Sequence, residues 1–525
     1  MYKVYFILLT SIALNYCKAQ NTSPTVFIES ASVNQTNKTV IINYNLVDID
    51  NDKCQVWLKY TKDGNGIFDS VTNNTSGDIG INILPGNNKT IIWNYPSSIL
   101  NINNVKFRIY ASDGKTIDIN ELVNKVDSNL LKSNLNFIAS GIRHLPTSNV
   151  FINKVRDTIE THFNNYKLLT EKQNFTFNSY TGVNIIGTKL GLKNEASTYI
   201  IDAHYDGVSN GPAADDNGSG LVGMIEAARI LSQYNFENSI KFIGFDFEES
   251  GLIGSAKYNQ SGIKQTESID GVLNFEMIGY YTNKINSQST PTGFNLLFPD
   301  AYNALVADQF RGNFLVVCGN TNSNSLNNTF INASKTYVPQ LKNISIEVPQ
   351  NGQIAPDFRR SDHASFWDNN KKALMLTDGA DTRNLAYHTS SDSIGNLNFT
   401  FMSNIVKASI ATIAVLAKPI SISYAEYDIS PVNIFSAKNY NFPPIIQIFP
   451  NPTSDEFTLK INTNEKLNIA LSLIDINGKI IYENTVNTAI GANIYQIKTN
   501  HLAKGTYSLL LKSNNFNTSK FITFK

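Results

Sequence analysis

Between residues 127 and 418, short apolar runs alternate with stretches whose apolar residues recur at helical spacing. The runs "STYIIDAHYD", "SIKFIGFDFEE", "IDGVLNFEMIG" and "KALMLTDGA" are typical of buried strands, and residues 221–234 follow the first of them with apolar positions three and four apart. Strands that alternate with helices predict a mostly parallel sheet with helices on both faces. We therefore expect an α/β domain over residues 127–418.

Two other regions alternate apolar and polar residues singly over short stretches. Residues 24–125 contain "KTVIINYNLVD", "CQVWLKYTKDG", "KTIIWNY" and "VKFRIYASDG", separated by turns rich in Asn, Asp and Gly, which predicts an immunoglobulin-like β-sandwich. Residues 446–525 return to short strands and predict a small second β-sandwich. The segment "DIDND" at residues 48–52 could ligate calcium, but its place between two strands favours a plain turn.

The first 19 residues have the pattern of a secretory signal peptide. Lys3 precedes an apolar run from Val4 to Leu14, and small residues stand before Gln20. We expect the protein to be exported. Cys17 leaves with this segment, and the two remaining cysteines fall in different predicted domains, so no disulfide framework is expected.

Charge adds little to this picture. The 43 basic residues balance the 43 acidic ones, so no net field favours nucleic acid or an acidic membrane surface as a partner.

Chemically reactive side chains stand where the predicted strands of the α/β domain end. His204 ends one strand run, Glu248 and Glu249 end the next, and Glu276 lies near the end of a third. Ligands of such sheets collect at the carboxyl ends of the strands. The loop "HYDGVSNGPAADDNGSG", residues 204–220, is therefore either part of a metal site or a solvated turn whose Asp and Gly only bend the backbone.

Five side chains of this domain have the composition of a metal site: His204, Asp216, Glu249, Glu276 and His388. Two imidazoles and three carboxylates suit two divalent ions that share one carboxylate. Mixed nitrogen and oxygen ligands favour Zn²⁺ over Ca²⁺ or Mg²⁺, which prefer oxygen alone. The ligand types therefore suit a pair of zinc ions, but the spacing of these residues in the sequence is by itself a weak signal.

The contexts of these residues carry a resemblance to a known family. The segments "HYD", "GPAADDNGSG", "FDFEESGLIGS", "NFEMIGY", "SDHASFW" and "YHTSSDS" resemble, in this order, the co-catalytic zinc aminopeptidases of the bacterial leucyl aminopeptidase and aminopeptidase Y type. The resemblance covers some 290 residues and implies an α/β zinc exopeptidase domain that holds two zinc ions per chain and acts on peptide or protein substrates.

The resemblance also implies a role for each matched position. His204 corresponds to a ligand of one zinc, Asp216 to the carboxylate that bridges both ions, with an Asp216–Asn217 peptide that is often cis, and Glu249, Glu276 and His388 to the remaining ligands. Glu248 corresponds to the general base and not to a ligand. Asp206 corresponds to the carboxylate that orients His204, and Tyr387 to a donor to the oxyanion in some members.

Position 276 departs from the family pattern. Many members have Asp where this chain has Glu276, which keeps the carboxylate and adds one methylene of reach. We expect metal binding to survive there. In the implied reaction, water activated by zinc attacks the scissile carbonyl, and Glu248 takes the proton of that water and passes it to the leaving amine.

The C-terminal region carries a second resemblance. The segments "FPNPTSDEFTL", "LIDINGKIIY" and "LAKGTYSLLL" resemble the sorting domain that directs proteins through the type IX secretion system. This resemblance implies the secretion machinery as a partner and translocation across the outer membrane. The alternative is a β-sandwich adhesion module.

The sequence thus predicts a secreted zinc exopeptidase, and an aminopeptidase in the first place. Other activities on the same scaffold are those of a carboxypeptidase, a dipeptidase or a glutaminyl cyclase. A catalytically inert surface binding protein is the alternative from another class. The presence of Glu248 beside the metal carboxylates argues against an inert domain.

Overall fold

The structure, a computed structural model, describes residues 21–429 except 62–67, 100, 101, 103, 104 and 146, and residues 445–524 except 450–452, 454, 455, 464, 465, 476–478, 499–501 and 514–516. The predicted signal peptide, residues 1–19, lies outside the described residues. Contacts divide the chain into two units, Met1–Lys115 with Ser421–Lys525, and Thr116–Ile420.

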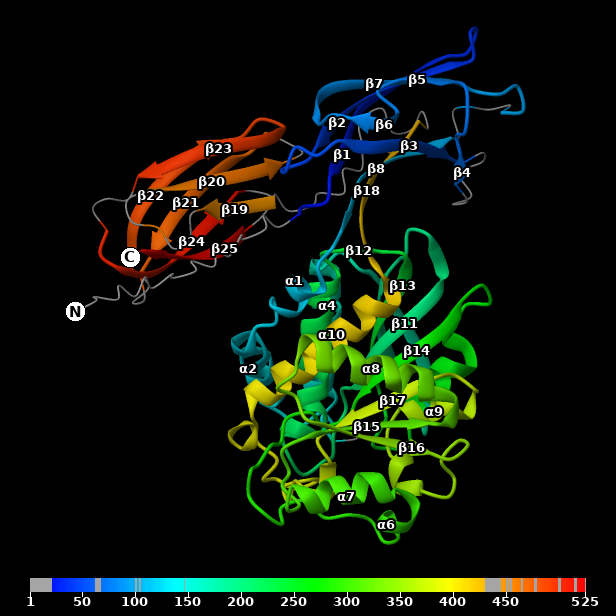
Figure 1. The fold of residues 1–525 in the computed structure, drawn as a ribbon, viewed down its shortest axis with the longest axis vertical. Coiled ribbons are helices and arrows are strands. Elements are labelled where there is room, and N and C mark those ends of the chain that lie inside the picture. Colours follow the sequence, from blue (N-terminus) through cyan, green and yellow to red (C-terminus); the bar gives the residue numbers. More distant parts are fainter. Residues whose placement is uncertain are drawn as a thin grey trace, which may run out of the picture. The chain divides into compact units, whose positions relative to one another are not determined.

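An eight-stranded mixed sheet forms the centre of the second unit (Figure 1). Its strands, in spatial order, are β16 (Asn343–Val348), β15 (Leu315–Asn320), β17 (Ala373–Thr377), β14 (Ser268–Phe275), β11 (Asn194–His204), β13 (Asn238–Phe245), β10 (Tyr180–Lys189) and β9 (Leu169–Phe177). The neighbours β17, β14, β11 and β13 run parallel, as do β15 and β16. The pairs β15–β17, β10–β13 and β9–β10 are antiparallel. The predicted α/β class is confirmed.

Helices complete the α/β unit: α1 (Ile119–Val123), α2 (Ser128–Ile138), α3 (Asn149–Asn165), α4 (Gly220–Leu231), α5 (Ile253–Lys257), α6 (Phe294–Leu297), α7 (Pro299–Ala307), α8 (Asn324–Tyr337), α9 (His363–Asp368) and α10 (Phe399–Ala417). Two hydrophobic cores form because successive side chains of a buried strand point to opposite faces of a sheet. Along β11, Ile201 packs into the core that also contains α4 and α10, whereas Ile200 packs into the core that contains α9. Both faces of the sheet are therefore buried.

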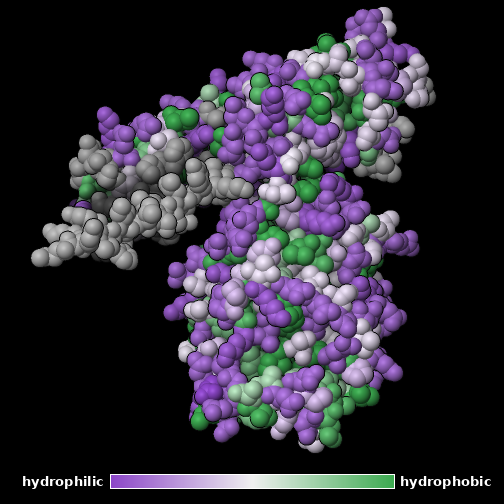
Figure 2. All heavy atoms as spheres, in the orientation of Figure 1, coloured by the Kyte–Doolittle hydropathy of each residue, from purple (hydrophilic) through white to green (hydrophobic). Residues whose placement is uncertain are grey.

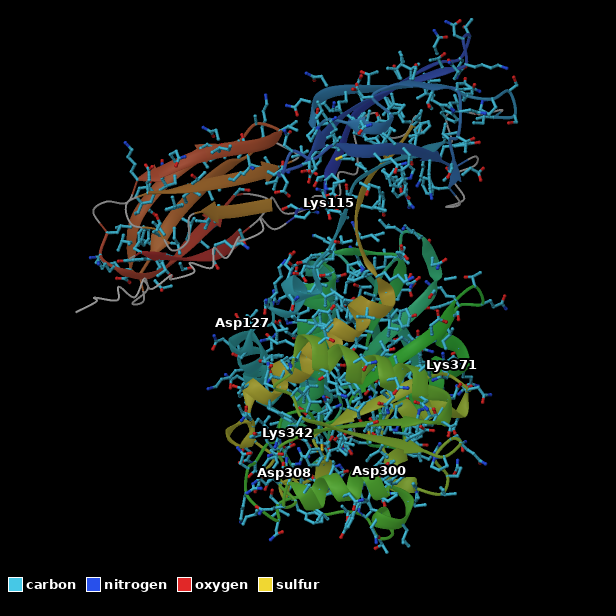
Figure 3. All side chains as sticks on the ribbon, viewed as in Figure 1. Lys115, Asp127, Asp300, Asp308, Lys342 and Lys371 are labelled. Atoms are coloured by element: carbon cyan, nitrogen blue, oxygen red, sulfur yellow. The ribbon has the colours of Figure 1, made fainter. Side chains whose placement is uncertain are left out.

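Side-chain caps begin three of these helices, and at the start of α1 the Asp118 side chain accepts a hydrogen bond from the Asn120 amide. The Asp127 side chain, labelled in Figure 3, accepts a hydrogen bond from the Asn129 amide at the start of α2, and Asn398 caps α10 through the Phe401 amide. Helix α10 is long and apolar enough to cross a membrane, but 67% of its most apolar window is buried inside the protein. It packs against α8, α1 and α4, as a core helix does. Hydrophilic residues cover most of the visible surface in Figure 2.

The first unit contains two β-rich regions with separate cores. In the N-terminal region one sheet contains β1 (Thr25–Asn34), β2 (Thr39–Val47), β7 (Gly86–Asn94) and β5 (Thr75–Gly77). The other contains β8 (Lys106–Thr116), β3 (Cys54–Tyr60) and β4 (Asp69–Ser70), and β6 (Gly80–Ile83) also pairs with β3. The strands that the alternating pattern predicted correspond to β2, β3, β7 and β8.

A strand from after the α/β unit joins the N-terminal region. Strand β18 (Pro419–Asp428) lies beside β8 in the sheet (Figure 1). From Ser421 onward it belongs to the same unit as β8. Its Glu426 accepts a hydrogen bond from Arg108 Nε at 2.8 Å, and the Tyr424 ring lies 5.2 Å from that of Tyr110. Residues Pro419 and Ile420, in the second unit, pair with β12 (Asn235–Phe236). The sequence patterns did not predict this strand.

The C-terminal region is all-β. Strands β19 (Ile445–Phe449), β20 (Glu456–Thr463) and β23 (Gly491–Lys498) form one sheet, and β22 (Ile480–Asn487), β21 (Asn468–Ile474), β24 (Gly505–Lys512) and β25 (Asn517–Phe524) form the other. Alternate residues of β20 and β24, including Phe457, Leu459, Leu509 and Leu511, are buried in its core.

Candidate metal centre

Three adjacent strands bring the predicted residues to one edge of the sheet. His204 is the last residue of β11 and pairs with Phe245, the last residue of β13. Glu276 directly follows β14, which runs parallel to β11 on its other side. Because these three strands run parallel, their carboxyl ends lie together. Glu248 and Glu249 lie a short loop beyond β13, and not within the strand as the apolar pattern suggested.

The loop after β11 returns Asp216 to this edge through contacts of Asp392 and Asn217, two residues of the quoted motifs to which the sequence assigned no role. The amides of Asp215 and Asp216 both donate to the Asp392 carboxylate, at 2.9 and 3.0 Å. The Asn217 side chain donates to the Phe275 carbonyl at 2.6 Å, which ties the loop to the end of β14. The Asp216–Asn217 peptide is cis, as the resemblance implied. The Asp392 carboxylate thus positions Asp216 by accepting a hydrogen bond from the Asp216 backbone amide.

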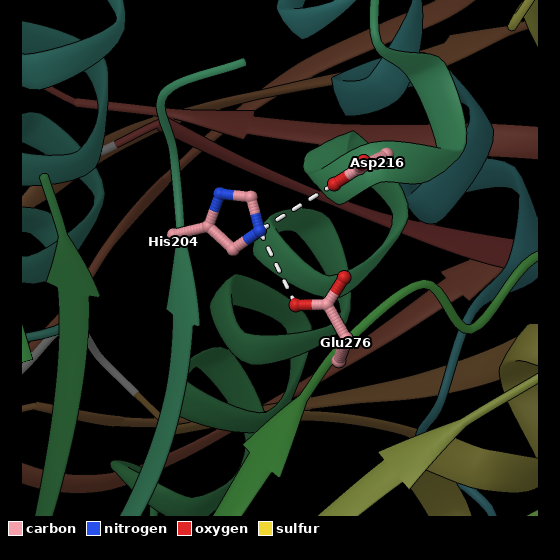
Figure 4. A group of neighbouring side chains, drawn as sticks. All are labelled: His204, Asp216 and Glu276. Carbon is pink, nitrogen blue, oxygen red and sulfur yellow. Dashed lines mark ion pairs between the residues drawn. The ribbon is translucent and has the colours of Figure 1, made fainter. Parts of the chain in front are cut away.

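One group of potential ligands consists of His204, Asp216 and Glu276 (Figure 4). His204 Nε2 lies 3.5 Å from Asp216 Oδ1 and 3.3 Å from Glu276 Oε2. All three residues are buried. Ser361 Oγ donates to Glu276 Oε2 at 2.7 Å and fixes that carboxylate.

The second group consists of Asp216, Glu249 and His388. His388 Nε2 lies 2.9 Å from Asp216 Oδ2 and 3.1 Å from Glu249 Oε2. Asp216 therefore belongs to both groups and turns one oxygen toward each histidine. In each group the possible ligand atoms lie within 4.8 Å of one another, and these are the two such groups among the residues that the structure describes.

The carboxylates of this cluster need a positive charge to compensate their negative charge. His204 Nε2 and Glu249 Oε1 are buried and have no hydrogen-bond partner among the described residues. Burial raises the pKa of Asp216, and the neighbouring Glu249 carboxylate adds to that rise. Although burial opposes it, the carboxylates of Asp216 and Glu249 raise the pKa of His388 to about 10. Buried carboxylates that crowd together are costly unless positive charge compensates them. The donor set fits two divalent ions.

Glu248 is placed differently from Glu249. Its Oε2 is 3.8 Å from His204 Nε2, the longest of the approaches to that nitrogen. Burial raises the pKa of Glu248 well above its ordinary value, and the carboxylates of Glu276 and Asp362 act in the same direction against the opposing effect of His204. Glu248 belongs to neither group of potential ligands. It faces the site as a carboxylate with proton-accepting capacity.

Asp206 links the first histidine to the two glutamates. Its Oδ1 lies 3.5 Å from His204 Nδ1 and accepts a hydrogen bond from the Glu248 amide at 3.1 Å. Its Oδ2 accepts from the Glu249 amide, also at 3.1 Å. One carboxylate thus fixes the loop that carries both glutamates and faces the far side of the imidazole.

Tyr387 lies beside the second group. Its ring stacks on that of His388, with centroids 3.8 Å apart and planes 16° apart. Burial raises the pKa of the Tyr387 hydroxyl above its ordinary range, the Asp216 carboxylate acts in the same direction, and Arg360 opposes the rise. The hydroxyl therefore carries its proton and can donate it.

Two further residues shape the surroundings of the site. His363 is buried, and its Nε2 lies 2.9 Å from the Phe358 carbonyl, so it is a structural histidine and belongs to neither group. Arg143, which no motif contains, is buried and donates to the carbonyls of Tyr205 and Ala213 at 2.8 and 2.7 Å. It therefore fastens both ends of the loop between His204 and Asp216.

Comparison with known proteins agrees with this geometry. Residues 184–413 match peptidase family M28, and residues 447–525 match the secretion system C-terminal sorting domain. The chain contains a peptidase family M28 domain. The sorting domain indicates secretion and association with the cell surface.

Several curated relatives share the M28 region. The uncharacterized protein YfbL of Escherichia coli is 30% identical over 224 residues, which cover 39% of this chain and 63% of YfbL. Aminopeptidase YwaD of Bacillus subtilis is 36% identical over 124 residues, covering 22% and 27% of the two chains. Leucine aminopeptidase 2 of Trichophyton rubrum is 36% identical over 105 residues, covering 20% and 21%. The chain thus spans less than two thirds of each of these relatives.

Among solved structures, the LapA aminopeptidase of Legionella pneumophila superposes with a TM-score of 0.44 at 22% identity, covering 57% of this chain and 73% of that one. The aminopeptidase from Aneurinibacillus sp. strain AM-1 has a TM-score of 0.45 at 16% identity, covering 57% and 97%.

Proposed function

We propose that the protein is a secreted aminopeptidase that binds two zinc ions per chain. The observation that carries the proposal is the pair of ligand groups that share Asp216, in which His204 Nε2 and Glu249 Oε1 are buried without a hydrogen-bond partner in the part of the chain that the structure describes. His204, Asp216 and Glu276 would hold one ion, and Asp216, Glu249 and His388 the other. Imidazole with carboxylate is a ligand set that zinc accepts.

The chain's own residues divide the work of peptide hydrolysis. Zinc bound there would act as a Lewis acid and lower the pKa of water toward about 7. Glu248 takes a proton from the attacking water and gives it to the leaving amine, a task that suits a buried carboxylate with a raised pKa. Asp206 holds His204 and the glutamate loop in place. The Tyr387 hydroxyl donates a hydrogen bond to the oxygen of the scissile carbonyl.

A cavity beside the ligands supports a preference for large apolar first residues. It measures about 230 Å³ and reaches from Glu276 and Tyr387 into the α/β unit. Its apolar walls come from Phe294, Leu305, Phe314, Val316, Ile344, Ile346, Phe358 and Met375. A dry apolar cavity of about 150 Å³ is large enough for benzene. The side chain of an N-terminal leucine, methionine or phenylalanine therefore fits.

Metal analysis combined with a substrate panel tests the proposal. We expect about two equivalents of zinc, hydrolysis of unblocked leucyl and phenylalanyl p-nitroanilides, and loss of activity on chelation. N-acetylated peptides should resist cleavage, and C-terminal amidation should have no effect. Release of C-terminal residues from N-acetylated peptides would instead assign a carboxypeptidase.

The domain organisation supports export through the type IX machinery. We propose a signal peptide at residues 1–19, an immunoglobulin-like sandwich at 24–125, the exopeptidase domain, with its mostly parallel sheet, at 127–418 and the sorting domain at 446–525.

Two truncated chains test this organisation. A chain ending at residue 430 keeps β18 and should retain its turnover number while failing to reach the cell surface. A chain ending at residue 418 lacks β18 and should unfold at lower temperature, because β8 loses its neighbour. Loss of activity in the longer truncation would make the tail part of the enzyme.

A further inference from the structure

Arg360 connects the wall of the cavity to the predicted oxyanion donor. Its Nη2 donates to the Tyr387 hydroxyl oxygen at 2.8 Å, and its Nη1 donates to Asp381 Oδ2 at 2.9 Å. All three residues line the cavity that begins at Glu276. Arg360 follows the helical turn Pro356–Arg359 and lies just before the "SDHASFW" segment. It is therefore placed by elements distant in sequence from Tyr387.

The direction of these hydrogen bonds fixes what the Tyr387 proton can do. A guanidinium has donors only, so the Tyr387 oxygen must accept from Arg360 and its own proton must point elsewhere. The ring is already restrained by stacking on His388. A cationic donor on a hydroxyl oxygen also polarises the O–H bond, which strengthens the hydrogen bond that the hydroxyl then donates.

We propose that Arg360, anchored by Asp381, is a positioning residue that aims the Tyr387 proton at the carbonyl oxygen of the bound peptide. The inference rests on the proposed aminopeptidase function and deepens it. Arg360 itself need not touch the reacting atoms. The side chains of Arg360 and Asp381 are each 44% exposed. Exposed ion pairs contribute little to folding stability, so loss of this pair should leave the fold intact.

Kinetics of single and double variants test this positioning. Tyr387→Phe should lower kcat by about 10²–10³-fold, as loss of one oxyanion donor does. Arg360→Ala should lower kcat by up to about 10²-fold with KM changed less than about twofold, because a misdirected donor costs turnover and not binding. The double variant should be no slower than Tyr387→Phe alone, since Arg360 acts through Tyr387. Arg360→Lys, which can still donate to the hydroxyl, should recover part of the loss.

The neighbouring arginine provides a matched control. Arg359 pairs with Asp368 at 2.7 Å and does not line the cavity, so Arg359→Ala should retain wild-type kcat. Wild-type kcat in Arg360→Ala, or losses that multiply in the double variant, would overturn the inference. A wild-type enzyme that hydrolyses no peptide would instead overturn the proposed function.

A spectroscopic measurement decides the same point without turnover. In protein with ¹³C at the tyrosine Cζ, the Tyr387 resonance is identified by its loss in Tyr387→Phe. It should shift in Arg360→Ala and stay in place in Arg359→Ala, because Arg360 donates to that hydroxyl whereas Arg359 donates to Asp368. An unshifted resonance in Arg360→Ala would show that the arginine does not hold Tyr387, and would overturn the inference regardless of activity.

Discussion

Two loops of this chain are rich in carboxylates and follow apolar strands, yet they do different things. The loop at residues 48–52 follows β2 in the N-terminal region, and the loop at residues 204–216 follows β11 in the M28 domain. In sequence, each could be a metal site or a turn. The difference between them lies in which partners the carboxylate oxygens find.

In the first loop the protein satisfies the carboxylates itself. Asp48 Oδ1 accepts from the amides of Asp50 and Asp52, at 2.9 and 3.3 Å. Asp50 Oδ2 accepts from the Thr22 amide at 2.7 Å, and Asp52 lies 3.5 Å from the Lys115 ammonium. Every acid here has a protein donor. The loop is the plain turn that the sequence favoured.

In the second loop the carboxylates converge on atoms that remain unsatisfied. Asp216 faces both His204 and His388, and no described residue forms a hydrogen bond with the Nε2 of His204. No histidine lies in the first loop. The number of acids therefore does not identify a metal site. A metal site is identified where carboxylates converge with imidazoles and where buried polar atoms lack hydrogen-bond partners among the described residues.

Removal of both imidazoles should have the largest effect. His204→Ala with His388→Ala takes the nitrogen ligand from each group, and we expect zinc to fall from about two equivalents to near zero and activity to become undetectable. His144→Ala, which removes a histidine that belongs to neither group, should leave both unchanged. Zinc content and leucyl p-nitroanilide hydrolysis are measured on all three proteins. A fully metallated and active double variant would show that the two histidines are not zinc ligands, and the second loop would then differ from the first no more than one turn from another.

The adjacent glutamates should separate in their effects. Glu248→Gln should keep zinc and lose about 10²–10⁴-fold in turnover, because proton transfer is lost while size and hydrogen bonding remain. Glu249→Gln should lose zinc as well, since Glu249 Oε2 lies in the group with Asp216 and His388. The two variants are compared by metal stoichiometry and kcat. Equal zinc loss in both would mean that base and ligand are wrongly assigned.

Much of the fold followed from local pattern. Buried strands have continuous apolar runs in the sequence, and β11, β13, β14 and β17 each overlap a predicted run, although β11, β13 and β14 begin one to three residues earlier. The strands that lie beyond the antiparallel pairs on the two sides of the sheet, β9 and β10 on one side and β15 and β16 on the other, were not predicted. Nor was β18, because it pairs with β8 more than 300 residues earlier in the chain. The local pattern of apolar residues shows which segments are buried, but it does not show which strand pairs with which.

The site shows the same limit. The residues brought together at the strand ends were all candidates from the sequence, because each stands in a short motif. Arg143, Asp392 and Arg360 act on that site through backbone carbonyls, backbone amides or another side chain. Such contacts need no fixed spacing in sequence. The roles of these three residues are therefore visible only once the chain is folded, whereas the family resemblance already implied that Asp206 orients His204.

Asp206→Asn should have an intermediate effect. The amide places a donor against the amide of Glu248 or Glu249, and it no longer presents a charge to His204 Nδ1. Loss of such an outer carboxylate commonly costs about 10–100-fold in metal affinity or activity. Zinc affinity measured by competition with a chelator, together with kcat, checks this. Wild-type zinc affinity and wild-type kcat in Asp206→Asn would show that the Asp206 carboxylate does not support the metal site.

Asp48→Asn should have the smallest effect, and on folding alone. Burial raises the pKa of Asp48 to about 6, above the ordinary value of about 3.9. The folded protein therefore binds this proton more tightly than the unfolded chain does. The stability that the proton contributes is present at low pH and is lost as pH rises from about 4 through about 6. We expect unfolding of the N-terminal region to become easier by roughly 1–3 kcal/mol over that range.

Asparagine removes this pH dependence but keeps an oxygen for the Asp50 and Asp52 amides. Trp57 and Trp93 lie in the N-terminal region and Trp367 in α9, so urea unfolding followed by fluorescence in a Trp367→Phe background reports on that region alone. The slope with pH should disappear in Asp48→Asn, while zinc content and kcat stay at wild-type values. Calcium should not shift the midpoint in either protein, because the carboxylates already have protein donors. A calcium-dependent shift that Asp48→Asn abolishes would make the first loop a metal site after all.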